Sequence, residues 1–201
     1  MTFLAVAIIG TLLKPVSGVA QSTTTTTSTQ TTPDTDSTAA KLDQAVAAHA
    51  QGDKATTVKA LQEASTALEN EAKSTNTSFK NKLTTGAEGL KSLIPLAETG
   101  LVKGNLLTKA ISIAKLALGG SQLETLLGGS ELTGKTSGLT SSLNLLKTGL
   151  SALGGSKQSA GQSLITKALS SVSKLDTGGA TAEPAARKQL GSVLDLVKGV
   201  L

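Results

Sequence analysis

The sequence contains no cysteine, tryptophan or tyrosine, and its 201 residues include only one histidine and two phenylalanines. The absence of cysteine excludes disulfides, thiolate nucleophiles, zinc–thiolate sites and a lipid-anchored lipoprotein. The absence of tryptophan and tyrosine argues against carbohydrate stacking, base stacking and aromatic cages. Any hydrophobic core must therefore be built from Leu, Ile, Val and Ala, apart from one phenylalanine.

The single histidine, His49, is the only residue that raises the question of a metal site. It follows Leu42 and Val46 at helical spacing, near the expected end of a helix. A metal site needs three or four ligands, and the nearest carboxylates in sequence are Asp43 and Asp53. Because Asp53 follows a glycine, it suits a helix cap better than a ligand. We interpret His49 as a packed or partly solvated residue, and predict no metal ligands and no cofactor.

No group of residues has the pattern of a catalytic site. Glu69 and Glu71 are two residues apart and face different sides of a helix. No Gly-x-Ser-x-Gly pentapeptide occurs, and Gly134-Lys135-Thr136 lacks the earlier glycine and the strand of a phosphate loop. The sequence therefore predicts a protein that is not an enzyme, with no catalytic or cofactor-binding residues.

The first 20 residues have the order of an export signal. An apolar run over residues 3–13 would be about 16 Å long as a helix, well short of the ~30 Å hydrocarbon core of a bilayer. Lys14-Pro15 and small residues at 17–20 come next, which predicts a signal peptide over 1–20 and an extracytoplasmic protein, periplasmic or secreted. Only Met1-Thr2 precede the run, so either the α-amino group supplies the usual positive charge or the true start lies upstream.

A Thr/Ser-rich tract over residues 21–38 comes next and is predicted to be a disordered spacer. Its hydroxyls either carry O-linked sugars or remain unmodified. The remaining residues, 39–201, are enough for one ordinary domain, which we expect to be a helical bundle.

Within that domain, residues 39–85 are predicted to form an N-terminal helical hairpin. The first helix should end at Gly52, and Asp53 should cap a long second helix over residues 54–83. One apolar stripe runs along the second helix at alternating steps of three and four residues, at Val58, Leu61, Ser65, Leu68, Ala72, Thr75 and Phe79. The form of an N-glycosylation acceptor, Asn76-Thr77-Ser78, falls inside this predicted helix.

Residues 86–201 contain an internal repeat with a period near 50. Residues 89–101 match residues 138–150 at an offset of 49, and the same helix type, type A, recurs near the C-terminus. A second type, type B, alternates with it, since residues 107–112 match residues 165–170. The predicted order is A-B-A-B-A, which indicates stacked helical hairpins. The type A stripes are Leu90, Ile94, Ala97 and Leu101; Leu139, Leu143, Leu146 and Leu150; and Leu190, Leu194, Val197 and Leu201.

The same four residues, Leu-Gly-Gly-Ser, occur at 118–121, 127–130 and 153–156. Each is predicted to end a helix at the Leu, with a left-handed Gly and a Ser that caps the next segment, so that a short linking helix would span residues 121–127. Thr181 and Pro184 are predicted to start the last helix, and Pro95 to kink the first type A helix.

The sequence thus predicts an all-α fold, an amphipathic bundle of about 6–7 helices built from repeated hairpins behind a signal peptide and a spacer. From Lys73 onward, fourteen Lys and one Arg against seven acidic residues give a charge of +8, spread as single residues. We predict an exported structural or interaction protein that binds an unknown protein partner or itself, through exposed Leu of the type A helices and the Lys beside them.

The alternative is a protein of the membrane surface that acts through amphipathic Leu/Lys helices. The scattered Lys residues favour weak contact with an anionic membrane or glycan, and no nucleic acid is expected.

Overall fold

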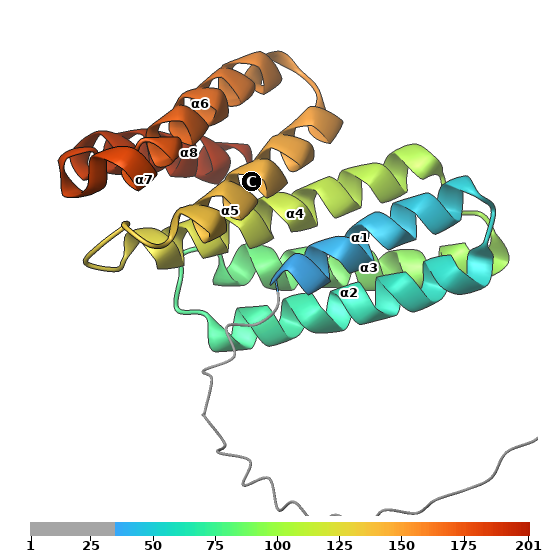
Figure 1. The fold of residues 1–201 in the computed structure, drawn as a ribbon. Helices are drawn as coiled ribbons and strands as arrows, with labels where there is room; N and C mark the ends of the chain where they lie inside the picture. Colours follow the sequence, from blue (N-terminus) through green and yellow to red (C-terminus); the bar gives the residue numbers. More distant parts are fainter. Residues whose placement is uncertain (1–34) are drawn as a thin grey trace, which may run out of the picture. The chain divides into compact units, whose positions relative to one another are not determined.

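The computed structural model describes the backbone of residues 35–201, and the side chains of residues 37–155 and 158–201. This part of the chain is all-helical and contains no strand (Figure 1). The seven long helices are α1 (Thr35–Ala50), α2 (Lys54–Ser74), α3 (Lys80–Thr99), α4 (Gly104–Leu127), α5 (Thr136–Leu153), α6 (Ser156–Ser173) and α8 (Glu183–Val200). A single turn, α7 (Leu175–Gly178), and a 3₁₀ segment, η1 (Gly179–Thr181), link α6 to α8. The all-α prediction is confirmed.

The N-terminal predictions fall mostly outside this region. The predicted signal peptide and the predicted spacer as far as residue 34 lie outside the described residues. Residues 35–38, which the sequence assigned to the spacer, form the first turn of α1. Within residues 35–201, no helix combines the length and the hydropathy that crossing a bilayer requires.

Two apolar cores share α4. The first is formed by α1, α2, α3 and residues of α4 that include Leu107, Ile111 and Ala114. The second is formed by α5, α6, α8, Phe79 and residues of α4 that include Leu116 and Leu123. Helix α4 packs against α1, α3, α5 and α8, and Figure 1 shows it between α3 and α5. Different parts of the α4 surface are therefore covered by different helices, and the candidate site includes a part of α4 that they leave exposed.

The type A segments correspond to α3, α5 and α8, and their stripes are largely buried as predicted. Leu101 is the exception, because it lies outside α3 and is 71% exposed. Gly100, at φ +75°, ends the helix, and the N–H groups of Gly100 and Leu101 donate to the carbonyls of Ala97 and Leu96. This Schellman cap turns the chain before Leu101 can join the stripe.

The predicted single helix over residues 54–83 is wrong, because a non-helical connection at 75–79 divides it into α2 and α3. The hydroxyls of Thr75 and Thr77 both hydrogen-bond to the hydroxyl of Ser121, at 3.2 and 3.0 Å. Side-chain hydrogen bonds of this kind compete with helical backbone bonds and stabilise the break.

The Asn-Thr-Ser sequence therefore lies in a connection and not in a helix. Asn76 is exposed, while the backbone N–H and the hydroxyl of Ser78 both donate to the carboxylate of Glu124, at 3.0 and 2.6 Å. These bonds fix the start of α3 against α4.

The predicted helix break at 118–121 is also wrong, as is the linking helix after it, because α4 continues through both. A Cβ on Gly119 would lie 3.0 Å from Cγ of Leu146, and one on Gly120 would lie 2.5 Å from the ring of Phe79. These glycines allow close approach of neighbouring elements and do not end the helix.

The other two Leu-Gly-Gly-Ser sequences end a helix at the Leu, as predicted, since α4 ends at Leu127 and α5 at Leu153. The left-handed glycine is wrong at 127–130, where Gly128 has φ −67°, whereas Gly154 has a positive φ of +69°. The predicted Ser caps are also wrong, because α5 begins at Thr136 and α6 begins at Ser156 itself, after Gly155.

The last helix begins at Glu183, two residues after Thr181, which instead belongs to η1. Pro184 lies in the first turn of α8, as predicted.

The only arginine links α8 to the end of α4. The Arg187 guanidinium donates to the carbonyls of Leu127, Gly129 and Ser130 at 2.8–2.9 Å, and to the carboxylate of Glu183 at 2.8 Å. Carbonyls at a helix C-terminus lack helical partners, so a cation here caps α4.

Candidate interaction site

His49 is half-buried on α1, beside a cavity of about 90 Å³ that Lys54, Thr57 and Val102 also line. Asp53 is committed to capping α2, since its carboxylate accepts the N–H of Thr56 at 3.0 Å. The bond from the Thr56 hydroxyl is the main cause that lowers the pKa of Asp53. Among the described residues, no three His, Asp or Glu side chains lie together in a way that could hold a metal ion.

Glu69 and Glu71 are held in different environments. Glu69 forms an ion pair with Lys91 of α3, and the hydrogen bond from Lys91 lowers the pKa of Glu69. Glu71 lies in the buried part of α2, where desolvation raises its pKa. The structure does not bring the two carboxyl groups together as an acid–base pair.

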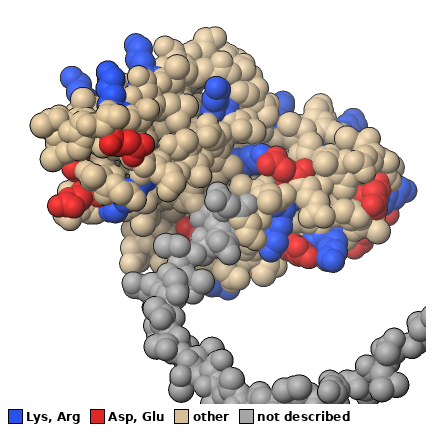
Figure 2. Space-filling model, viewed as in Figure 1, with Lys and Arg blue, Asp and Glu red and all other residues tan. Residues whose placement is uncertain are grey.

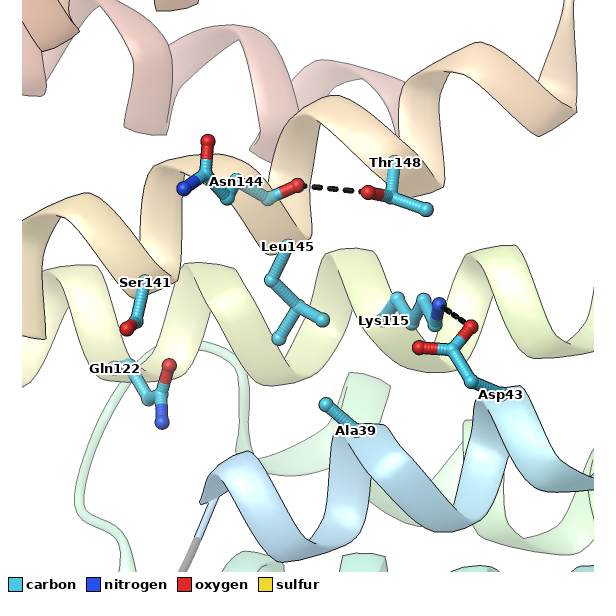
Figure 3. Close-up of a pocket in the computed structure, with 8 residues that line it drawn as sticks. All are labelled: Ala39, Asp43, Lys115, Gln122, Ser141, Asn144, Leu145 and Thr148. Atoms are coloured by element: carbon cyan, nitrogen blue, oxygen red, sulfur yellow. Dashed lines mark hydrogen bonds and ion pairs between the residues drawn. The ribbon is translucent and has the colours of Figure 1, made fainter.

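A polar groove of about 250 Å³ lies where α1 and α5 both approach α4 (Figure 3). Its one ion pair joins the buried ammonium of Lys115, on α4, to the carboxylate of Asp43, on α1. Figure 3 shows Lys115 reaching toward Asp43, with Leu145 of α5 between this pair and Gln122. Ser141, Asn144 and Thr148 supply the α5 side of the groove.

The groove is below the usual 300–1,000 Å³ of a small-molecule site. Its ammonium is already neutralised by Asp43, and Thr148 donates to the backbone carbonyl of Asn144 at 2.9 Å. The ion pair therefore has a clear structural role, which is to join α1 to α4. Nothing in the groove beyond this pair indicates a ligand.

A second feature is a group of exposed apolar side chains, which we call the α3–α4 strip. Large apolar side chains that are more than about a third exposed occur, within the described region, only between residues 96 and 113. They are Leu96 (37%), Leu101 (71%), Leu106 (46%) and Ile113 (38%).

The members of the strip are neighbours through two kinds of local structure. Leu101 and Leu96 are the two positions that make the apolar contact of a Schellman cap, and the Leu101 N–H lies 2.8 Å from the Leu96 carbonyl. Leu106 and Ile113 are seven residues apart on α4, so they lie on the same face of that helix. The strip thus extends from the end of α3 around the loop and along α4.

The same face of α4 is covered further along the helix. Steps of four and three residues connect Leu106, Ala110, Ile113, Ala117, Gly120 and Glu124. Ala117 is fully buried, Gly120 faces Phe79, and Glu124 forms an ion pair with Lys198 of α8 at 3.5 Å. The covered half of the face belongs to the first core at Ala117 and meets Phe79 and α8 at Gly120 and Glu124, and the exposed half carries the strip.

The charges beside the strip are basic. Lys103 and Lys109 are exposed next to Leu101 and Leu106, while the only carboxylate of α4, Glu124, is bonded at the other end of the helix. Helix α5 contains no acidic residue. On the face that Figure 2 shows, charged residues stand singly or in small groups, separated by uncharged surface.

Sequence reasoning anticipated this site only in part. It proposed contact through exposed Leu of the type A helices, and Leu96 is such an exposed Leu. It did not include Leu106 and Ile113, which lie on a type B helix. The sequence around Ile113 does not indicate that this side chain is exposed, because its helical spacing from buried residues is the spacing that a core Ile would have.

No protein-family model, curated protein or solved structure matches this chain. Its function has to be argued from the residues and their arrangement alone.

Proposed function

We propose that this protein is an exported, non-enzymatic helical bundle that binds a protein partner through the α3–α4 strip. Export rests on the leader pattern of residues 1–20. The observation that supports binding is that all the large apolar side chains of the described region that are more than about a third exposed lie between residues 96 and 113. Scattered exposed apolar residues need no explanation, whereas a contiguous group is typical of an interaction site.

The size of the strip sets the strength of the contact. Its four exposed fractions together amount to about two whole aliphatic side chains. Burying that much apolar surface gains roughly 3–6 kcal/mol before the costs of association. A micromolar complex needs about 8 kcal/mol, so the strip alone supports a weak contact, to which the neighbouring Lys103 and Lys109 must add.

The membrane alternative also depends on the α3–α4 strip. The Leu stripes that would lie on a bilayer in that alternative are packed in the two cores, with Leu139, Leu143 and Leu146 fully buried. A bilayer contact of the folded protein would therefore use the strip and its two lysines, without the Trp or Tyr that usually mark a membrane interface.

The test uses the full chain, expressed with its own leader in its source cells. A photo-crosslinking residue replaces Leu101 in one variant and Lys167, which is exposed on α6, in a matched control. We expect a discrete protein adduct from position 101, recovered in the extracytoplasmic fraction, and none from position 167.

Three results would contradict the proposal. Crosslinking that is equal at the two positions would show that the strip is not the contact surface. Recovery of the chain only in the cytoplasm would exclude export. Sedimentation with anionic vesicles that is lost in the Leu101→Ser variant would favour the membrane alternative.

A further inference from the structure

We propose that the partner presents an acidic amphipathic α-helix, which lies along the α3–α4 strip. This helix would cover the exposed half of the α4 face, next to the half that the first core, Phe79 and α8 cover. This inference rests on the proposed function and specifies the class of its partner. Three features support it, namely the face of α4, the spacing of its apolar residues and the charges beside them.

First, one continuous face of α4 is only half covered. Ala117 is buried in the first core, Gly120 faces Phe79, and Glu124 pairs with Lys198 of α8, which lies 5.9 Å from the centre of the Phe79 ring. The last residue of the chain, Leu201, is partly buried against both cores, and its carbonyl accepts a hydrogen bond from Lys82 of α3. Inside the protein, this face of α4 already packs against a helix.

Second, the uncovered residues have helical spacing. Leu106 and Ile113 are seven residues apart, or about 10 Å along the helix axis. This is two helical turns, which is the distance between apolar residues at i and i+7 on a partner helix lying alongside. Leu96 and Leu101 add a second row of contacts at the loop end of the strip.

Third, the charges beside the strip have one sign. Lys109 lies between Leu106 and Ile113 in sequence, and Lys103 lies in the loop before α4. Glu98, the carboxylate closest to Leu96 in sequence, is two residues further on and points about 200° around α3 from it. With basic residues beside the strip and no carboxylate on the exposed half of α4, a partner helix with acidic flanks is favoured.

The same charges disfavour a second copy of the chain. A two-fold contact would bring Lys103 and Lys109 of one copy toward the same residues of the other, without carboxylates on the strip to pair with them. A bilayer is disfavoured by the absence of aromatic residues in the strip.

The test uses the full mature chain and a synthetic probe. The probe is a labelled peptide of about 18 residues with Leu at i, i+3, i+4 and i+7 spacing and Glu at most other positions. A scrambled peptide of the same composition, which has no apolar face, is the control. Fluorescence anisotropy gives the Kd at low and at high salt.

We expect the amphipathic peptide, and not the scrambled one, to bind with a Kd between about one and a few hundred micromolar, more weakly at high salt. Leu106→Ser should weaken binding about three- to tenfold, because the exposed half of the Leu side chain contributes about 0.7–1.4 kcal/mol to such a contact. Lys109→Glu should weaken it several-fold, and the matched charge reversal Lys167→Glu on α6 should leave the Kd unchanged. Circular dichroism checks that each variant remains folded.

Several outcomes would overturn the inference. They are no binding of the amphipathic peptide, equal binding of the scrambled peptide, and equal weakening by Lys109→Glu and Lys167→Glu. Binding of phosphatidylglycerol vesicles that Leu106→Ser abolishes would assign the strip to lipid, and sedimentation equilibrium that shows a dimer lost in the same variant would assign it to a second copy. If the peptide fails while the crosslink from position 101 persists, the helix inference is wrong and the proposed function stands.

Discussion

Gly149 lies where α5 crosses α4, at a point where the two backbones approach closely. A Cβ on Gly149 would lie 2.8 Å from Cγ of Leu116 and 3.0 Å from the backbone oxygen of Ser112. The contact is reciprocal, because a Cβ on Gly119 of α4 would lie 3.1 Å from the backbone oxygen of Ser142 on α5. We predict that Gly149→Ala forces the two helices apart and lowers the free energy of unfolding.

The magnitude depends on two opposing effects. Alanine is favoured over glycine in a helix interior by about 0.5–1 kcal/mol. Overpacking of a core usually costs about 1–3 kcal/mol, and the upper part of that range applies here because a backbone oxygen cannot rotate away. The net loss for Gly149→Ala should be about 1–2 kcal/mol. A Cβ on Gly191 of α8 would have no neighbouring heavy atom within 4 Å, so Gly191→Ala should instead gain about 0.5–1 kcal/mol.

The assay is urea unfolding followed by far-ultraviolet circular dichroism, since the chain has no Trp or Tyr to report by fluorescence. The two variants should differ by about 1.5–3 kcal/mol, or roughly 3–12 °C in Tm for a domain of this size. A Gly149→Ala protein as stable as the unsubstituted chain would refute the close crossing of α4 and α5. A loss in Gly191→Ala would refute the helix-propensity part of the argument.

Three further predictions test other contacts. Arg187→Met should lower the free energy of unfolding by about 2 kcal/mol, because three carbonyl oxygens at and just after the end of α4 lose a charged donor, and thermal unfolding would show this as a lower Tm. Asp43→Ala should cost about 2–3 kcal/mol and Lys115→Met less than about 1 kcal/mol, because only the first leaves a buried ammonium unpaired; the reverse order in urea unfolding would contradict this account of the ion pair. Burial raises the pKa of Glu71, so the folded chain binds that proton more tightly than the unfolded chain, and stability falls as the pH rises above the ordinary pKa of 4.5. Glu71→Gln should therefore raise the Tm at neutral pH and change it little well below pH 4.5, and an equal effect at both would show that the carboxyl charge is not the cause.

The helical class could be predicted because the apolar spacing repeats over every long segment. The stripe from Leu139 to Leu150 shows this most clearly, since each of its four members is at most 2% exposed. Local signals also located caps correctly where the chain turns into solvent. Asp53 accepts the Thr56 N–H at the start of α2, and Gly52, at φ +73°, comes after α1. These features depend on residues close in sequence, so one sequence contains the information.

The wrong predictions concern positions where contacts with residues distant in sequence determine the local structure. Leu-Gly-Gly-Ser ends a helix at 127–130 and continues one at 118–121, although the four residues are the same. The difference is that Gly119 and Gly120 lie against Leu146 and Phe79, so tertiary packing retains them inside α4. Helix propensity is only about 1 kcal/mol per glycine, which a well-packed contact exceeds.

The candidate site could not be predicted for a related reason. Leu106 and Ile113 share a face of α4 with the fully buried Ala117, and in sequence the whole face has the pattern of core. Which half of that face is exposed depends on how far α8 reaches along α4, and that is set by contacts such as Lys198 with Glu124 and Lys82 with the carbonyl of Leu201. The apolar spacing therefore indicates that this face of α4 should be covered along its full length. Only the fold shows that one half of the face is covered and the other half is exposed. A second helix that covers the exposed half would meet the same packing surface as α8, which is why we assign the strip to a helix and not to a lipid surface.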